Sequence, residues 1–227
     1  MSDKEFDVYF SLNQKKLSTG VFKKLDDNLA FFNEDSLEIN SLEKSIEKNI
    51  KEVEKKIDAF VNNIFLMIDT EEKISIYISL MKKLDNKKIQ IKDIQHLIQD
   101  AKQQIVRAHN DKSIIHIIVN KYNIDGLDYT SVPSDISCDK ISIDVEFICF
   151  PKNLIKKIEL LFNNFQISID KIICSNYAKS FVNDKDESNI CQVGYNLNKH
   201  LNTQEVVIVP KKVEKKGFFE KLFHLFE

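Results

Sequence analysis

The start of the chain alternates short apolar runs with polar turns. The runs DVYFSL and KLSTGVF are joined at the polar residues 13–16, a pattern typical of a β-hairpin. A third run, LAFFNED at residues 29–35, follows the turn-forming residues Asp26, Asp27 and Asn28. We therefore expect three short, sequential strands at the start of the chain.

Apolar residues then recur at steps of four and three, which is the period of one helix face. They are Leu42, Ile46, Ile50, Val53, Ile57, Val61 and Ile64. Asn40 lies three residues before Glu43, a spacing that favours an N-cap with a reaching glutamate. The run IFLMID that follows is apolar almost throughout, so it predicts a buried strand.

The central section mixes strand-like and helix-like patterns. Alternation or enrichment in Ile, Val and Phe predicts strands at residues 73–84, 114–125, 140–150 and 170–174. Helical spacing of apolar residues predicts helices at residues 94–105 and 154–162. The order strand, helix, strand, strand, helix indicates an α+β fold rather than a series of βαβ units.

The last 45 residues change character twice. Hydrophobic periodicity fades over residues 183–213, which predicts a flexible linker. At 100° per residue, the apolar side chains of residues 214–227 then fall within an arc of roughly 160°. We expect a membrane-targeting amphipathic helix whose binding residues are Lys215, Lys216, Phe218, Phe219, Leu222, Phe223, Leu225 and Phe226. The alternative is a terminal helix that docks on a protein core.

Charge and glycine content exclude several function classes. The chain has 227 residues with 33 Lys+Arg against 35 Asp+Glu, which argues against general nucleic-acid binding. Four isolated glycines cannot form a glycine-rich loop around a phosphate. The first ten residues lack an apolar segment and no apolar run reaches 18 residues, so neither a secretory signal nor a membrane-spanning helix is expected.

Candidate catalytic and metal-binding residues are sparse. The four cysteines form no C-x-x-C pair and have no histidine at zinc-ligand spacing, so we expect no metal site. His116 lies within an apolar strand, where a hydrogen-bonded core histidine is expected rather than a ligand or a base. No Ser or Cys has the context of a nucleophile, so catalysis is not expected.

The segment Ile114–Gly126 resembles the stretch EILHVIPQEYIVDG of FtsA, a family of actin-like bacterial cell-division proteins. Four residues coincide at unbroken spacing: His116, Tyr122, Asp125 and Gly126. The family's Pro-Gln-Glu is replaced by Val119, Asn120 and Lys121. Flanking segments at residues 89–105 and 167–180 are also similar to the family, and the resemblance covers roughly residues 40–182.

The resemblance implies a division of the chain into four parts, because FtsA proteins carry a strand-helix-strand-strand insert and end in a linker and an amphipathic helix. Residues 1–72 and 168–182 would be a remnant of the first actin-like subdomain. Residues 73–167 would be the inserted interaction domain, 183–213 the linker and 214–227 the membrane-targeting helix.

The nucleotide site of the family is altered here. The Asp-x-Gly-Thr loop that wraps ATP phosphates in FtsA is replaced by Ser11, Asn13 and Gln14, and only Lys16 is kept. Without that glycine the backbone cannot approach a phosphate closely. The resemblance therefore implies a truncated relative that binds no cofactor and is not an enzyme.

The function that we expect is a cell-division scaffold at the cytoplasmic face of the bacterial inner membrane. Its partners would be division proteins, FtsZ as a further candidate, other copies of the chain and anionic lipid, but no nucleic acid. A soluble interaction module similar to the type IV pilus protein PilM is the alternative. A degenerate ATPase that still binds nucleotide is a third hypothesis.

Overall fold

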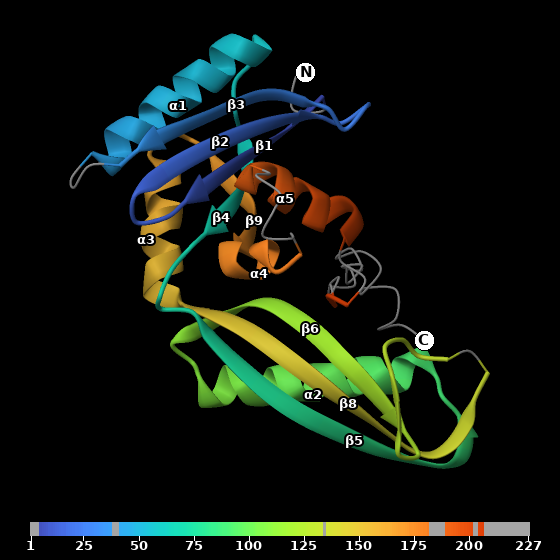
Figure 1. Cartoon of the computed structure of the whole chain (residues 1–227). Helices are drawn as coiled ribbons and strands as arrows, with labels where there is room; N and C mark the ends of the chain where they lie inside the picture. Colours follow the sequence, from blue (N-terminus) through green and yellow to red (C-terminus); the bar gives the residue numbers. More distant parts are fainter. Residues whose placement is uncertain (1–4, 38–40, 134, 182–188, 202–203, 207–227) are drawn as a thin grey trace, which may run out of the picture.

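Two β-sheets, each with its own helices, make up the computed structural model, which describes residues 5–37, 41–133, 135–181, 189–201 and 204–206 (Figure 1). One sheet has five strands in the order β3-β2-β1-β4-β9, and the other has four in the order β5-β8-β6-β7. The chain passes from the first sheet into the second and then returns, so β9 completes the first sheet. The predicted α+β class is confirmed.

The first three strands form an antiparallel meander, as their pattern predicts. They are β1 (Phe6–Leu12), β2 (Lys16–Lys23) and β3 (Leu29–Ser36). In the turn between β1 and β2, the Oδ1 atom of Asn13 accepts hydrogen bonds from the backbone N–H groups of Lys15 at 2.8 Å and Lys16 at 2.7 Å. This side chain imitates a backbone turn, which explains why a polar segment without glycine closes the hairpin.

Helix α1 (Leu42–Ile57) is shorter than its apolar stripe. It ends at Asp58, whose left-handed backbone (φ 53°) stops the helix. Val61 therefore lies in the connecting loop, and Ile64 belongs to strand β4 (Asn63–Ile68). The N-cap position is taken by Ser41, and the predicted cap Asn40 lies outside the described residues.

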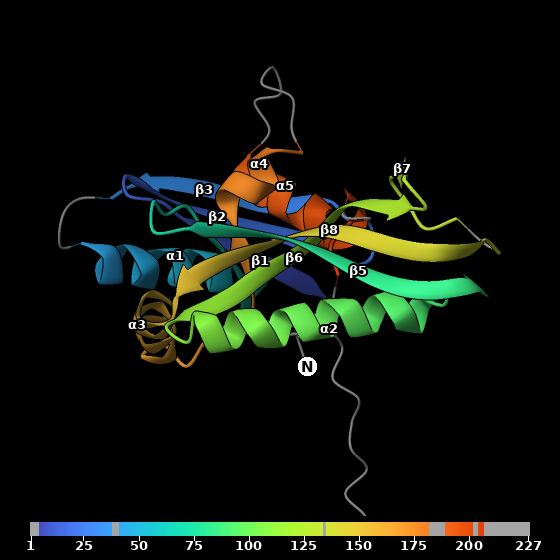
Figure 2. The same cartoon turned by 90° about the horizontal axis from the view of Figure 1, so that it is seen from below.

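The five-stranded sheet is covered on both faces. Strands β4 and β9 (Ser168–Cys174) run parallel to β1. Neighbouring residues of a strand point to opposite faces. The ring of Tyr9 lies 5.8 Å from Tyr195 of α5 (Ile190–Asn196), and that of Phe10 lies 5.6 Å from Phe162 of α3 (Lys152–Asn163). Helices α3 and α5 therefore cover opposite faces, as Figure 2 shows.

The prediction of a linker over residues 183–213 is wrong for residues 190–196. They form helix α5 (Ile190–Asn196). Its Cys191, Val193 and Tyr195 are buried in the hydrophobic core around the five-stranded sheet, which we call the first core. The helix is packed so closely that a Cβ at Gly20 would lie 2.6 Å from the Cβ of Cys191. Its seven residues are too few to produce a clear helical period in sequence. A π-helical turn (Leu197–Leu201) follows it, and the short helix α4 (Ser175–Lys179) precedes it.

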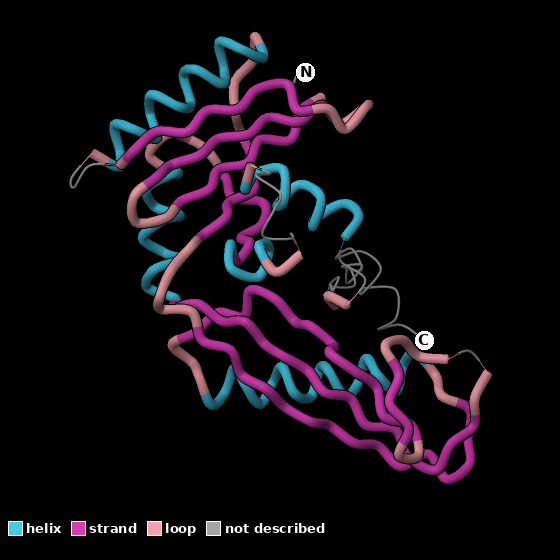
Figure 3. The backbone as a smooth tube through the Cα atoms, in the orientation of Figure 1, coloured by secondary structure: helices cyan, strands magenta, loops and turns pink. Residues whose placement is uncertain are grey.

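The second sheet has the predicted order of strand, helix, strand and strand. Its elements are β5 (Ile74–Lys88), α2 (Ile91–Ala108), β6 (Lys112–Ile124), the short β7 (Leu127–Tyr129) and β8 (Ser137–Pro151). All its strand pairs are antiparallel. Helix α2 lies along one face of this sheet (Figure 3). Its capping box is formed by Gln90 and Asp93.

Residues 73–167, which the resemblance assigns to the inserted domain, contribute to two hydrophobic clusters. The second core lies between α2 and the four-stranded sheet. Ile94, Ile98, Ile117, Val145 and Phe147 are buried in it, and Ile78 packs against it. Ile158 and Leu161 belong to the first core instead, because α3 packs under the five-stranded sheet. The second core therefore ends with β8 rather than at residue 167.

The predicted terminal helix, residues 214–227 with its eight membrane-binding residues, lies outside the described residues. Residues 207–213 of the predicted linker do so as well. Within the described ranges, no helix has the length and apolar character needed to span a membrane.

Candidate functional site

The carboxyl ends of the parallel strands β1, β4 and β9 lie side by side at one end of the five-stranded sheet. Ligands usually bind beside the carboxyl ends of parallel strands. A cavity of about 420 Å³ lies there. Its polar and charged lining residues are Ser11, Asn13, Lys16, Ser18, Glu34, Asp69, Ser175, Lys179 and Asn189. The structure thus brings the sequence-predicted Ser11, Asn13 and Lys16 together with residues from far along the chain. Gln14 lines an adjoining hollow.

The backbone donors of the β1–β2 turn are already occupied. A phosphate loop binds its ligand through free N–H groups of the backbone. In this turn the N–H groups of Lys15 and Lys16 donate to the side chain of Asn13. A phosphate would have to displace this internal acceptor, so the turn is poorly suited to bind one.

The ammonium groups of the cavity are also occupied. Lys16 Nζ lies 2.5 Å from Glu34 Oε1, and Lys179 Nζ lies 2.7 Å from Asp69 Oδ2. Ser18 donates a further hydrogen bond to Glu34, and the adjacent Lys16 holds the pKa of that carboxyl below its usual range. The two lysines thus face two carboxylates, and the cavity has little positive charge left for a nucleotide.

The remaining chemistry of the cavity is limited. Ser175 Oγ is buried and has no hydrogen-bond partner within the described part of the chain. No group of three metal-ligating side chains gathers anywhere in the described ranges. All four cysteines are buried, and burial raises the pKa of Cys149 to about 11, so its thiolate is scarce at neutral pH.

A second polar cluster joins the two sheets at His116 on β6. Its Nε2 atom accepts a hydrogen bond from the backbone N–H of Cys174 at 2.9 Å. The proton of the neutral ring therefore sits on Nδ1, which lies 2.8 Å from Glu205 Oε1 and donates to it. Tyr177 packs against the ring at 4.7 Å. The prediction of a hydrogen-bonded core histidine is confirmed.

Residues 204–206 pair with the edge of β6. The N–H of Val119 donates to Gln204 O at 3.0 Å, and the N–H of Val206 donates to Ile117 O at 2.8 Å. The Glu205 side chain between them is only 5% exposed and also lies 3.7 Å from Lys171 Nζ of β9. Sequence reasoning missed Glu205, although the apolar run VVIV that follows it could have indicated a strand.

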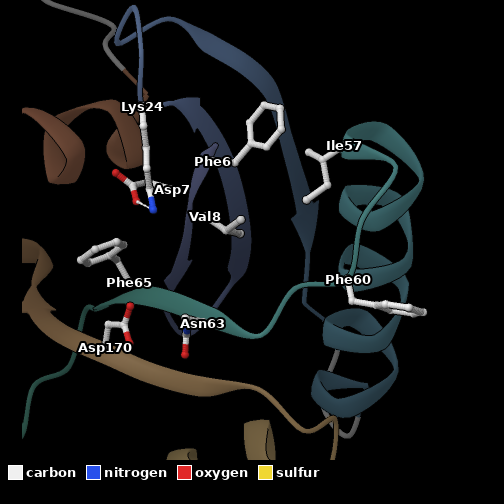
Figure 4. Close-up of a pocket in the computed structure, with 9 residues that line it drawn as sticks. All are labelled: Phe6, Asp7, Val8, Lys24, Ile57, Phe60, Asn63, Phe65 and Asp170. Carbon is white, nitrogen blue, oxygen red and sulfur yellow. Dashed lines mark ion pairs between the residues drawn. The ribbon is translucent and has the colours of Figure 1, made fainter. Parts of the chain in front are cut away.

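A further hollow at the opposite, amino-terminal ends of β1 and β4 is shown in Figure 4. Phe6, Val8, Ile57 and Phe65 are among its lining residues, and Lys24 and Asp7 form an ion pair at 3.3 Å within it. Its volume is about 60 Å³. Small-molecule sites usually enclose about 300–1,000 Å³, so this hollow is a packing feature.

Comparison with protein families identifies the second sheet. Residues 72–149 match the SHS2 domain inserted in FTSA, and these bounds coincide closely with β5 to β8. The cell division protein FtsA of Buchnera aphidicola (strain APS) is 25% identical over 202 residues, which are 83% of this chain and 48% of that protein. That of Agrobacterium fabrum is 20% identical over 141 residues, 62% of this chain and 31% of that one.

Solved structures show weaker similarity. The PilM–PilN type IV pilus biogenesis complex has a TM-score of 0.47 at 7% identity, covering 78% of this chain and 49% of the matched one. The cytoplasmic domain of EpsL, an inner membrane component of the type II secretion system of Vibrio cholerae, has a TM-score of 0.39 at 9% identity. It covers 76% of this chain and 57% of that domain.

These findings define an α+β protein in which an SHS2 domain of the type inserted in FtsA is joined to a second, five-stranded unit. The chain is an FtsA-like relative: beyond the SHS2 domain it is similar to curated cell division proteins FtsA, at 20–25% identity. It spans about half the length of the Buchnera protein and about a third of the Agrobacterium one.

Proposed function

We propose that this chain is a non-enzymatic, FtsA-like scaffold of bacterial cell division. Its SHS2 domain binds division proteins and further copies of the chain, and residues 214–227 hold it peripherally at the cytoplasmic face of the inner membrane. FtsZ and later division proteins are the partners to test. The observation that carries this proposal is the match of residues 72–149 to the FtsA-type SHS2 domain.

Each of the two hydrophobic cores corresponds to one part of the proposed function. The five-stranded sheet with α1, α3, α4 and α5 is the actin-like part, and the sheet from β5 to β8 is the interaction domain. Residues 207–213 then act as a linker to the terminal helix. His116 of the SHS2 domain links the three, because it contacts the actin-like part at Cys174 and the segment 204–206 at Glu205.

Absence of nucleotide binding is supported by the internal pairing of the cavity at the strand ends. Asn13 occupies the N–H groups of the turn, while Glu34 and Asp69 occupy the two lysines. Isothermal titration of the chain with Mg–ATP is expected to show no heat of binding. Saturable heat, or turnover above a buffer control, would contradict this part of the proposal.

The membrane anchor should be weak. Six large apolar side chains contribute ~1.5–3 kcal/mol each when fully buried, and an interfacial helix buries about half of that. Ordering about ten residues into a helix costs about 1 kcal/mol per residue and offsets much of the gain. The balance resembles a single acyl chain with a binding constant near ~10⁴ M⁻¹, so stable attachment needs several linked copies.

Co-sedimentation of the whole chain with anionic vesicles tests the anchor. Phe219→Glu should abolish sedimentation, whereas His224→Glu adds the same charge on the polar face of the helix and should weaken it only slightly. Neither change should lower the melting temperature. If Phe219→Glu instead lowers the melting temperature by many degrees and the parent chain never sediments, the helix is docked on protein. The soluble interaction module would then be correct.

A further inference from the structure

Strand β5 forms one edge of the four-stranded sheet and is 15 residues long. In the part of the chain that the structure describes, it pairs with β8 alone. The other edge differs, because β7 has only three residues and residues 204–206 pair with β6 at Ile117 and Val119. A long edge strand with free backbone N–H and C=O groups is a template for another strand.

The first half of β5, residues 74–81, lacks the usual protection against such pairing, whereas lysines and a register shift lie in its second half. Proteins guard edge strands with charged residues, proline or bulges. Residues 74–81 of β5 contain no charged residue and no proline. Tyr77 and Met81 on this stretch are 68% and 59% exposed, so two large apolar side chains face solvent beside the free backbone.

The sequence of this edge is close to a palindrome. Residues 74–80 (ISIYISL) read almost the same in both directions about Tyr77. An antiparallel pair of β5 strands centred on Tyr77 places like residues opposite one another. The resulting pairs are Ile74 with Leu80, Ser75 with Ser79, Ile76 with Ile78, and Tyr77 with itself.

The same register matches the two faces of the sheet. Lys82 Nζ lies 2.8 Å from Asp93 Oδ1 of α2, so even-numbered residues of this stretch face the helix. Odd-numbered residues face the open side, where Tyr77 Oη donates to Glu146 at 3.1 Å. Pairing about Tyr77 joins even with even and odd with odd positions, so both helices α2 would lie on one face of the joined sheet.

Charges at the two ends of the segment favour this antiparallel register. Glu71 and Glu72 precede the strand, while Lys82 and Lys83 follow its apolar stretch. In the register about Tyr77, the turn that holds Glu71 and Glu72 comes beside Lys82 and Lys83 of the second copy. A parallel pair would place like charges together, which is destabilising.

We propose that two copies of this chain pair antiparallel through β5, with the two-fold axis at Tyr77, and so form one continuous eight-stranded sheet. The inference deepens the self-association in the proposed function, since it names the surface and the register. A dimer also links two copies of residues 214–227, which raises their combined membrane affinity through effective concentration.

Disulfide cross-linking of the whole chain in lipid-free solution tests the register. Directly opposite residues have Cα atoms about 4.5–5.5 Å apart, which suits a disulfide. Tyr77→Cys should therefore cross-link under mild oxidation. Met81→Cys is the matched control, being exposed on the same face of the same strand. Its two copies would lie about 27 Å apart, because eight residues at about 3.4 Å separate them.

We expect Tyr77→Cys to cross-link about tenfold faster than Met81→Cys, since pairing raises the effective concentration of its thiols. The four native cysteines are buried, so the parent chain gives the background. Equal rates for the two variants would overturn the proposal. A mixture of Ser75→Cys and Ser79→Cys chains should form mixed dimers in preference to either homodimer.

Charge reversal gives a second test that does not depend on oxidation. Lys83→Glu alone and Glu71→Lys alone should each weaken the dimer about threefold or more in sedimentation velocity, and the double variant should recover it. A chain that stays monomeric at the highest soluble concentration, or a double variant that is weaker than both singles, would overturn the proposal. Loss of vesicle binding with the dimer intact would instead refute the membrane anchor alone.

Discussion

The two sheets differ in how many of their faces are covered by helices. The five-stranded sheet has helices on both faces, and its edge strand β3 is tied to α1 by polar contacts such as the ion pair of Lys48 with Asp35 at 3.0 Å. The SHS2 sheet has α2 on one face, while its other face carries polar pairs such as Ser79 with Asp144 at 2.6 Å. Antiparallel sheets commonly have one such solvated face. The first sheet is therefore covered by helices on both faces, whereas the second has one open face and an apolar edge at β5.

The largest expected effects separate the two cores. Phe162→Ala in the first core and Phe147→Ala in the second should each lower the free energy of unfolding by about 3–5 kcal/mol, because both side chains are fully buried. Urea denaturation measures the loss, with the exposed Met81→Ala as a control expected within about 0.5 kcal/mol of the parent.

Hydrogen exchange sharpens this result. At native conditions Phe147→Ala should speed amide exchange in residues 74–151, and Phe162→Ala should speed it in β1, β4 and β9. Equal acceleration in both sheets by either variant would show that the two clusters behave as a single core, contrary to the comparison.

The junction between the units should be the next most sensitive place. His116→Leu removes the acceptor of the Cys174 N–H and the donor to the Glu205 carboxylate, so we expect a loss of about 2–4 kcal/mol. His96→Leu, at an exposed position of α2, is the control. Exchange at residues 117–119 should also rise, since Glu205 holds the segment that covers this edge.

A double variant tests whether the cost lies in the buried carboxylate. His116→Leu with Glu205→Leu should recover part of the stability that His116→Leu loses, because no buried charge then lacks its donor. A double variant that simply adds the two losses would mean that His116 acts by packing on Tyr177 rather than by its hydrogen bonds.

The smallest expected effect is on the free energy of unfolding at acidic pH. Lys82 donates to Asp93 and holds the pKa of that carboxyl below its usual range. A depressed pKa stabilises the fold above the unfolded value near ~4, and this stability is lost as pH falls through the folded value. In urea denaturation, the free energy of unfolding of the parent chain falls between pH 6 and pH 3. Asp93→Asn should make this fall smaller by about 0.5–1 kcal/mol. An unchanged acid slope would contradict this role for the Lys82 pair.

The sequence predicted best where structure is set by local pattern. The strands at residues 114–125 and 140–150 and the stripe Ile94–Ile105 appear where their periods place them. Helix α5 was missed because its stability comes from contacts with Tyr9 and Gly20, far away in sequence. Glu205 was missed for the same reason, since its partner His116 lies 89 residues earlier.

The assignment of α3 shows the same limit. Its helical period was clear, and the helix exists over Lys152–Asn163. Period alone cannot say which sheet a helix covers: the bounds 73–167 include this helix in the inserted domain, whereas Ile158 and Leu161 pack in the core of the five-stranded sheet. The resemblance pointed to Ser11, Asn13 and Lys16 as positions of an altered nucleotide site, and these residues line the cavity, whereas Asp69, Ser175 and Lys179 reach it only through the parallel pairing of β4 and β9.

The contrast between the charged edge strand β3 and the apolar edge strand β5 can be measured directly by hydrogen exchange of the whole chain at increasing protein concentration. The account predicts that amides of residues 74–81 in β5 slow as concentration rises, while those of β3, the edge of the five-stranded sheet, do not change. Exchange at β5 that is independent of concentration, or slowing at β3 instead, would contradict it.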